Sequence, residues 1–334
     1  MAKIATYHGV DPSAELARDA GIKPEDVIRL NANENPYGAY DKVSEALMTL
    51  DLHLYPDTQQ RKLRAALGEY TGQPVERIIA GAGGDEIIDL LMRLFVERGQ
   101  SVIDCEPTFG MYGFSARLAD AEIVSVPRNS TWEINIPAML EAIDDQARIV
   151  FLASPNNPTG NLLTESDARS LLETGIVVCV DETYYEFAQI SLSHLLEEYE
   201  NLVILRSFSK WAGIAGLRVG YAIASETLIR HLMDIKQPYN INVAGEAAAS
   251  LIVQRKRLEE AIDGLDGISY YPSEGNFLLC RFEHRTAEEA YVALAKHGIF
   301  VRRFPQSVLV DSLRISAGTS EQTDRLIDAL RIVA

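Results

Sequence analysis

The sequence is organised around Asn201-Leu-Val-Ile-Leu-Arg-Ser-Phe-Ser-Lys-Trp-Ala-Gly-Ile-Ala-Gly-Leu-Arg-Val-Gly-Tyr221. Residues 202–205 are apolar and have the length and composition of a buried strand. The residues that follow are polar and include Ser207, Ser209 and Lys210. A lysine just past a strand of an open α/β sheet lies where such sheets bind ligands. Burial would lower its pKa, and such an amine can form a Schiff base with a carbonyl. Lys210 is therefore a candidate nucleophile; the alternative is an ordinary surface lysine in a loop.

The composition limits the function classes. With 334 residues and 47% hydrophobic residues, the chain can bury the core of one large or two moderate domains. Its net charge of −17 predicts no affinity for nucleic acid or an anionic membrane. The three cysteines are far apart in apolar stretches and predict reduced thiols of a cytoplasmic protein. No histidines pair at ligand spacing, so we expect no metal site. No signal peptide or apolar run of roughly 18 residues is visible, so we expect no membrane span.

Strand and helix patterns alternate through the first two thirds of the chain. Short apolar runs predict strands at 77–80, 101–105, 122–126, 148–153, 175–180 and 202–205. Because these runs are continuously apolar, they indicate strands buried on both faces of a largely parallel sheet. Helices are expected between them, and others at 41–50 and 58–70.

The C-terminal part has a different pattern. A long helix to about residue 265 precedes predicted strands at 268–271, 276–282, 299–303 and 312–316, with helices between and after them. This pattern predicts a second, smaller α+β domain. The predicted organisation is an N-terminal arm and entry to the small domain over 1–38, a large ligand-binding domain over 39–238, and a small domain over 239–334.

Polar and aromatic residues follow five of the predicted strands. Each lies just past the carboxyl end of a different strand: Gly84 with Asp85, Phe109, Asn157, Asp181 and Lys210. In a parallel sheet these ends share the ligand-binding edge. A glycine-rich turn that opens a helix, as at 81–84, suits an anion, although Glu86 stands where a dinucleotide fingerprint needs glycine. Asp181 alone could cap a helix, and Asn157 could form a turn. Together the five predict a site for a ligand with a phosphate, a ring and a carbonyl.

The motifs around these residues resemble those of the fold-type I pyridoxal-phosphate aminotransferases, and more narrowly those of the histidinol-phosphate aminotransferase family. They run in family order along nearly the whole chain: Asn31-Ala-Asn-Glu-Asn-Pro-Tyr-Gly38, Tyr55-Pro-Asp57, Gly83-Gly-Asp-Glu86, Pro107-Thr-Phe-Gly-Met-Tyr112, Ser154-Pro-Asn-Asn-Pro-Thr-Gly160, Asp181-Glu-Thr-Tyr-Tyr-Glu-Phe187, Ser207-Phe-Ser-Lys-Trp-Ala-Gly-Ile-Ala-Gly-Leu-Arg-Val-Gly-Tyr221 and Leu313-Arg-Ile-Ser-Ala-Gly-Thr319. The resemblance implies transfer of an amino group between L-histidinol phosphate and 2-oxoglutarate in histidine biosynthesis, with pyridoxal 5′-phosphate as cofactor.

Several other functions remain open at this point. An aromatic-amino-acid aminotransferase or a threonine-phosphate decarboxylase would use the same scaffold, because fold does not settle substrate. A non-catalytic regulatory protein that binds pyridoxal phosphate is a further alternative. A nicotinamide oxidoreductase is disfavoured by the incomplete glycine pattern.

The resemblance also implies the roles of the cofactor site. Lys210 would hold the cofactor as a Schiff base and then carry the substrate's α-proton, and Asp181 would keep the pyridine nitrogen protonated. Tyr184 and Asn157 would hydrogen-bond the phenolic oxygen of the ring. Phe109, where many members have tyrosine, would stack on the ring without the hydrogen bond of that hydroxyl. The phosphate would be bound by Ser207, Ser209, Arg218, and the backbone N–H groups of Gly84 and Asp85.

The implied substrate contacts are fewer. Arg314 would bind the substrate carboxylate, with Asn33 nearby, and Tyr7 and Arg302 would contact the distal phosphate of histidinol phosphate. Tyr55 would reach the cofactor phosphate of a partner subunit. The resemblance therefore implies a homodimer with shared active sites.

Overall fold

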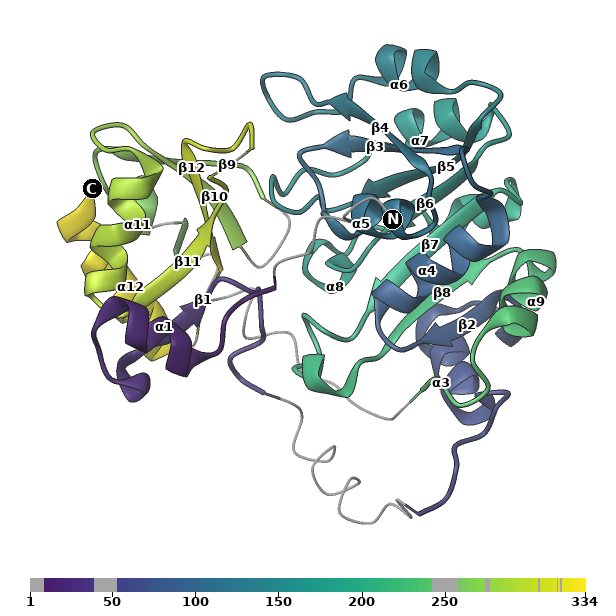
Figure 1. Cartoon of the computed structure of the whole chain (residues 1–334), viewed down its shortest axis with the longest axis horizontal. Helices are drawn as coiled ribbons and strands as arrows, with labels where there is room; N and C mark the ends of the chain where they lie inside the picture. Colours follow the sequence, from purple (N-terminus) through teal and green to yellow (C-terminus); the bar gives the residue numbers. More distant parts are fainter. Residues whose placement is uncertain are drawn as a thin grey trace.

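The computed structural model describes residues 9–38, 53–241, 258–259, 261–273, 277–305, 307–316, 318 and 320–334. Two sheets lie at the centres of two lobes that sit side by side (Figure 1). The larger sheet has seven strands and the smaller five, among the described residues. The predicted helix at 41–50 and most of the long helix before residue 265 lie outside the described residues.

The large sheet is mostly parallel, as predicted. Its strands, in spatial order, are β2 (Ile78–Gly81), β8 (Gly220–Ala224), β7 (Leu202–Ser207), β6 (Val177–Asp181), β5 (Ala147–Ala153), β3 (Ser101–Glu106) and β4 (Glu122–Pro127). β8 is antiparallel to both of its neighbours, and the other adjacent pairs are parallel. The strands β2, β3, β5, β6 and β7 therefore point the same way, and their carboxyl ends share one edge. The strand β8 was not predicted.

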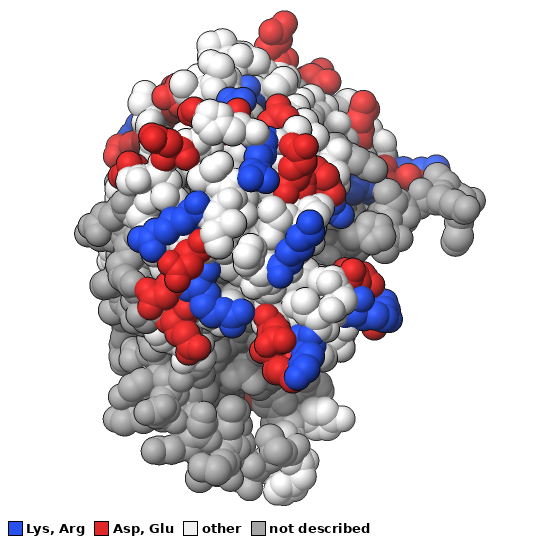
Figure 2. Space-filling view, turned by 90° about the vertical axis from the view of Figure 1, so that its left-hand side faces the viewer, with Lys and Arg blue, Asp and Glu red and all other residues white. Residues whose placement is uncertain are grey.

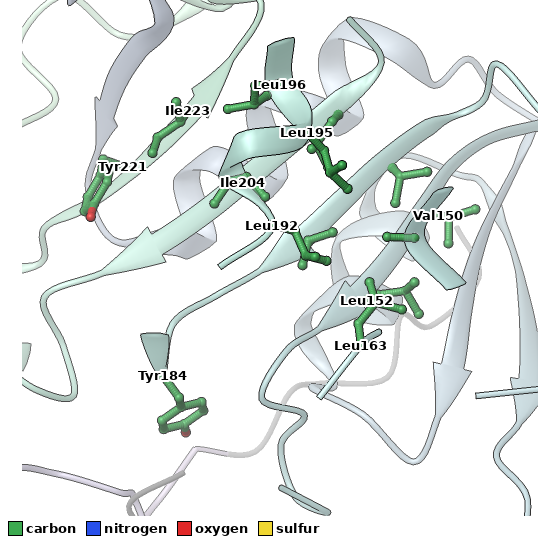
Figure 3. Packing of buried hydrophobic residues seen from close by; sticks show 14 of the residues in the cluster. Val150, Leu152, Leu163, Tyr184, Leu192, Leu195, Leu196, Ile204, Tyr221 and Ile223 are labelled. Atoms are coloured by element: carbon green, nitrogen blue, oxygen red, sulfur yellow. The ribbon is translucent and has the colours of Figure 1, made fainter. Parts of the chain in front are cut away.

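Helices cover both faces of the large sheet. One layer contains α4 (Gly84–Phe95), α5 (Met111–Leu118) and α9 (Glu226–Ile235). The other contains α3 (Arg61–Thr71), α6 (Ile136–Ala142), α7 (Glu165–Leu172) and α8 (Tyr185–Ala188), with short 3-10 turns η2 (Val75–Arg77), η3 (Ser193–Glu197) and η4 (Ala215–Leu217) nearby in the chain. Figure 3 shows Leu192, Leu195 and Leu196 packed against strand residues of this second face. Burial on both faces explains why the strands are continuously apolar.

The small sheet draws strands from both ends of the chain. Its order is β1 (Ile28–Leu30), β11 (Ile299–Arg303), β12 (Ser312–Ser316), β10 (Phe277–Phe282) and β9 (Ile268–Tyr271). The helices α11 (Ala287–Lys296) and α12 (Ser320–Val333) pack against it. The helix α1 (Ser13–Ala20) and the turn η1 (Pro24–Asp26) precede β1. β1 was not predicted, and it joins the N-terminal segment to the small sheet by parallel pairing with β11. The domain boundaries at 38/39 and 238/239 stay predictions.

The described surface carries charged side chains of both signs. Figure 2 shows acidic and basic side chains interspersed on the face that lies at the left of Figure 1. Exposed ion pairs of this kind join Arg303 to Glu288 and Arg331 to Asp328. No helix of the described residues is long and apolar enough to cross a membrane.

Candidate active site

Lys210 lies three residues past the end of β7, on the edge where the parallel strands end. Its Nζ donates a hydrogen bond to the carbonyl of Ala32, at 2.9 Å. Burial lowers the pKa of Lys210 to about 8, and the positive charge of Arg314 acts in the same direction. An amine with this pKa is largely neutral at mildly alkaline pH, so Lys210 is suited to attack a carbonyl.

Asp181 is the last residue of β6 and is only 6% exposed. The hydroxyl of Tyr112 donates to its Oδ2 at 2.8 Å, and the backbone N–H of Thr183 donates to Oδ1 at 3.0 Å. Burial raises the pKa of Asp181, and the hydrogen bonds from Tyr112 and Thr183 offset only part of this rise. A buried carboxylate with two neutral donors is suited to a cationic partner such as a protonated ring nitrogen.

The glycine turn and Arg218 form a compact cradle. Gly83 has φ of +85°, and a Cβ added there would collide with the guanidinium of Arg218. Arg218 also donates to Oδ2 of Asp85, at 2.9 Å. A Cβ added to Gly220 would lie 2.6 Å from the backbone nitrogen of Gly84. Because these glycines have no side chains, the N-terminus of α4 lies close to Arg218. The backbone N–H groups of the helix and the guanidinium together suit a phosphate.

The two predicted serines lie beside this cradle. Ser207 ends β7 and is paired with Gly220 of β8, the residue that packs on the glycine turn. Its Oγ donates to Oγ of Ser209 at 2.9 Å and accepts from the backbone N–H of Ser209 at 3.1 Å. Both serines are buried, so their hydroxyls are placed at the same end of the sheet as Lys210. The set of aldehyde-reactive amine, buried carboxylate and phosphate cradle fits pyridoxal 5′-phosphate.

Tyr112, the donor to Asp181, packs against Phe109. Phe109 lies in the loop between β3 and α5, and its ring meets that of Tyr112 edge-on, with centroids 5.6 Å apart. Tyr112 was part of a quoted motif, but sequence reasoning assigned it no role. Its distance from Asp181 in the chain, 69 residues, explains why no local pattern reveals the hydrogen bond.

Arg314 brings the small sheet to this site. It lies in the middle of β12 and is 7% exposed. Its Nη1 donates to Oδ1 of Asn157, and its Nη2 donates to the carbonyl of Asn31 at 3.1 Å. Asn157 follows β5 of the large sheet, so Arg314 spans the two lobes. Arg302 of β11 is directly opposite Arg314 in the antiparallel ladder.

Asn33 and Tyr184 form a second link across the lobes. Asn33 donates through Nδ2 to the hydroxyl of Tyr184 at 2.7 Å, and its Oδ1 accepts from the hydroxyl of Ser316. Tyr184 is 4% exposed and meets the ring of Phe277 edge-on at 5.1 Å. Figure 3 shows Tyr184 set apart from the packed leucines and isoleucines of the same cluster. Its hydroxyl is therefore held at the seam between the two sheets.

Two of the predicted site residues, Tyr55 and Tyr7, are not part of the site described above. Tyr55 is 81% exposed, and its ring stacks on that of Tyr239 with centroids 4.4 Å apart. Within the part of the chain that the structure describes, Tyr55 packs on Tyr239 and not on the residues around Lys210. Tyr7 lies outside the described residues. No group of three or more histidines, cysteines or acidic residues in the described part of the chain is arranged to bind a metal ion.

Comparisons with known proteins place the chain among the class I and II aminotransferases. The family model for aminotransferase class I and II matches residues 25–256 and 245–330. The chain is 44% identical to the histidinol-phosphate aminotransferase of Roseiflexus castenholzii, over 100% of this chain and 97% of that protein. It is 40% identical to histidinol-phosphate aminotransferase 1, chloroplastic, of Arabidopsis thaliana, over 99% of this chain and 84% of that protein. The crystal structure of the Sinorhizobium meliloti histidinol-phosphate aminotransferase in complex with pyridoxal-5′-phosphate superposes with a TM-score of 0.85 and 25% identity, covering 98% of this chain and 95% of that chain.

Proposed function

The chain belongs to the histidinol-phosphate aminotransferase family of class I and II aminotransferases, and from this premise we propose that it transfers the amino group of L-histidinol phosphate to 2-oxoglutarate, with pyridoxal 5′-phosphate as cofactor. The observation that carries the proposal is the contact of Arg314 with Asn157. It places an anion-binding guanidinium from the small sheet beside the edge of the large sheet that presents Lys210.

Groups that match the parts of the cofactor would hold it. Lys210 would be the attachment point for its aldehyde, and Asp181 would bind its ring nitrogen. Ser207, Ser209 and Arg218 would bind its phosphate, with the backbone N–H groups of Gly84 and Asp85. Phe109 would pack on the ring, while Tyr184 and Asn157 would donate to its phenolic oxygen. When bound, the cofactor supplies a conjugated ring that accepts the electron pair left on the substrate's α-carbon.

Lys210 has the proton chemistry that amino transfer requires. With a pKa of about 8, its Nζ would accept the α-proton of the donor and later return a proton to the acceptor's α-carbon. Asp181 would keep the ring nitrogen protonated, and Tyr184 is held in place by Asn33. Lys210, Asp181 and Tyr184 are therefore the proposed catalytic residues.

Arg302 and Arg314, which are opposite each other in the small sheet, form the proposed binding site for the substrate's anionic group. Residues directly opposite in an antiparallel pair have Cβ atoms about 4.5–5.5 Å apart, and like charges there destabilise the sheet. An anion between Arg302 and Arg314 would relieve this repulsion. Histidinol phosphate carries a phosphate ester where an amino acid carries its carboxylate, and this ester is longer and can carry a second negative charge. Both arginines would therefore bind the phosphate, whereas a carboxylate, as in 2-oxoglutarate or phenylalanine, would bind Arg314 alone.

The assembly is proposed to be a cytoplasmic homodimer with shared sites. The exposed rings of Tyr55 and Tyr239 support this, because stacked aromatic side chains at 81% and 52% exposure are typical of a surface that a partner covers. In the dimer, Tyr55 would reach the cofactor phosphate of the partner.

The three cysteines are free and buried, in keeping with a reducing compartment.

A donor panel tests the proposal. The purified protein is incubated with 2-oxoglutarate and, in turn, histidinol phosphate, phenylalanine, tyrosine and threonine phosphate, while glutamate and carbon dioxide are measured. We expect glutamate to form fastest from histidinol phosphate. Faster turnover of the aromatic donors, or carbon dioxide from threonine phosphate without glutamate, would overturn the assignment.

A further inference from the structure

Tyr112 is a buried residue of the site to which the resemblance gives no role. It lies in the first turn of α5, and its side chain is fully buried. Its ring stacks on Phe151 of β5, with centroids 5.0 Å apart and planes at 13°. The same ring meets the edge of Phe109. Packing on two sides therefore fixes the direction in which its hydroxyl points.

That hydroxyl acts as a donor to Asp181. Burial raises the pKa of Tyr112 well above the ordinary value, so the hydroxyl stays protonated. It donates to Oδ2 of Asp181, while Thr183 donates to Oδ1 from its backbone. A hydrogen bond to a carboxylate favours the charged form over the neutral one. The bond from Tyr112 thus opposes the desolvation that favours a neutral Asp181.

We propose that Tyr112 is a positioning residue whose hydroxyl keeps the proton shared by Asp181 and the cofactor's ring nitrogen on the nitrogen. The inference rests on the proposed function, because it needs pyridoxal phosphate at this site. Without the hydroxyl, Oδ2 of Asp181 loses a donor and the carboxyl group retains more of the shared proton. The ring nitrogen then carries less positive charge and accepts electrons less readily. The residues proposed to bind the substrate's phosphate and carboxylate, Arg302 and Arg314, do not include Tyr112.

The test is the nitrogen NMR signal of the bound cofactor. Wild-type protein and Tyr112→Phe are loaded with pyridoxal phosphate labelled with ¹⁵N in the ring, and their spectra are compared at one pH. We expect a pyridinium shift in the wild type and a movement toward the unprotonated pyridine shift in Tyr112→Phe. We also expect kcat to fall about tenfold, with KM for the donor within about twofold, because a hydrogen bond to a charged group is lost.

Two further variants separate this role from a merely structural one. Tyr221 of β8 is also fully buried, and it is paired with Arg206 in the ladder and not with Asp181. Tyr221→Phe removes a buried hydroxyl elsewhere and should leave the ¹⁵N shift unchanged. In an Asp181→Asn background, Tyr112→Phe should move the shift no further, because its effect passes through the carboxylate.

The possible results separate a failure of the role of Tyr112 from a failure of the proposed function. A pyridinium shift in the wild type that Tyr112→Phe leaves unchanged would overturn the role of Tyr112 alone. A shift that Tyr221→Phe reproduces, or that persists at full size in the Asp181→Asn background, would overturn it as well. Wild-type protein that binds no labelled cofactor would overturn the proposed function, and this inference with it.

Discussion

Arg314 of the small sheet donates a hydrogen bond to the side-chain oxygen of Asn157, which follows a strand of the large sheet. The other terminal nitrogen of the same guanidinium donates to the carbonyl of Asn31, in the segment that leads out of β1. Arg314 therefore joins its own strand to two other parts of the chain. The anion site that it offers exists only when the two lobes and the N-terminal segment are assembled.

Replacing Lys210 with alanine should remove the covalent attachment of the cofactor. Borohydride reduction of the loaded wild type should add the mass of the cofactor to the peptide that contains Lys210. The Lys210→Ala protein should show no such mass increase, and its turnover should fall by several orders of magnitude, because it loses the amine and the proton carrier. Attachment at another lysine, or sustained turnover in the variant, would show that Lys210 is not the nucleophile.

Arg302 should set the preference for a phosphorylated donor. Arg302→Ala is expected to lower kcat/KM for histidinol phosphate by roughly 10–100-fold, the range for a lost charged hydrogen bond. The loss for phenylalanine should be much smaller. Arg303→Ala is the matched control, because the neighbouring Arg303 is exposed and pairs with Glu288. Equal losses on both donors in Arg302→Ala would exclude Arg302 from the phosphate site.

The pH dependence of cofactor attachment should reflect the lowered pKa of Lys210. A lysine with a pKa of about 8 becomes neutral as the pH rises from 7 to 9, well before the ordinary value of 10.5. The rate of pyridoxal-phosphate incorporation into cofactor-free protein should therefore rise through about pH 8 and then level off. Arg314→Gln removes a positive charge that lowers this pKa, so its midpoint should move to higher pH. A wild-type midpoint near 10.5 would contradict the buried environment of Lys210.

Gly83 should be needed for the phosphate cradle. Gly83→Ala would place a Cβ against the guanidinium of Arg218 and strain a backbone with φ of +85°. Gly175→Ala also falls at a positive φ, +80°, but its Cβ would meet open space. Each variant should lose about 1–3 kcal/mol of stability from the backbone strain. The affinity for pyridoxal phosphate, measured by titration of cofactor-free protein, should fall in Gly83→Ala only; an equal fall in both would argue against the cradle.

The ion pair of Glu182 with Arg206 should contribute strongly to folding. Both side chains are buried, and Nη2 of Arg206 lies 2.9 Å from Oε2 of Glu182. Glu182→Gln leaves the guanidinium without its counter-charge, which typically costs about 3–5 kcal/mol. Urea unfolding should therefore show a lower midpoint at an unchanged slope. Glu288→Gln, in an exposed pair, should have little effect; comparable losses in both would contradict the importance of burial.

The strands that could be predicted from the sequence are those with a continuous apolar run. Strands such as β5 and β6 are continuous apolar runs because both of their faces are buried, and this pattern is visible in the sequence. β1 has only three residues and is ordered by pairing with β11, about 270 residues away. β8 begins at Gly220, inside the motif that follows Lys210, and its reversed direction depends on its two neighbours. β1 is too short to leave a local pattern. The apolar residues 221–224 of β8 are visible in the sequence, but the antiparallel direction of this strand is not.

The same distinction applies to the site. Lys210 and Asp181 could be proposed from their positions just past strands, because parallel strands end on one edge. The contacts that orient them come from distant segments: Tyr112 to Asp181, Asn33 to Tyr184, and Ala32 to Lys210. Such pairings are set by tertiary packing, so only the structure reveals them. The partner-subunit role of Tyr55 stays a prediction.

The most direct test of the central claim follows the amino nitrogen itself. The loaded protein is mixed with ¹⁵N-labelled histidinol phosphate without an acceptor, freed of excess donor, and then given 2-oxoglutarate. The account predicts about one equivalent of ¹⁵N-glutamate per active site, and a far slower first step when labelled phenylalanine replaces histidinol phosphate. Unlabelled glutamate, no glutamate, or a faster transfer from phenylalanine would contradict it.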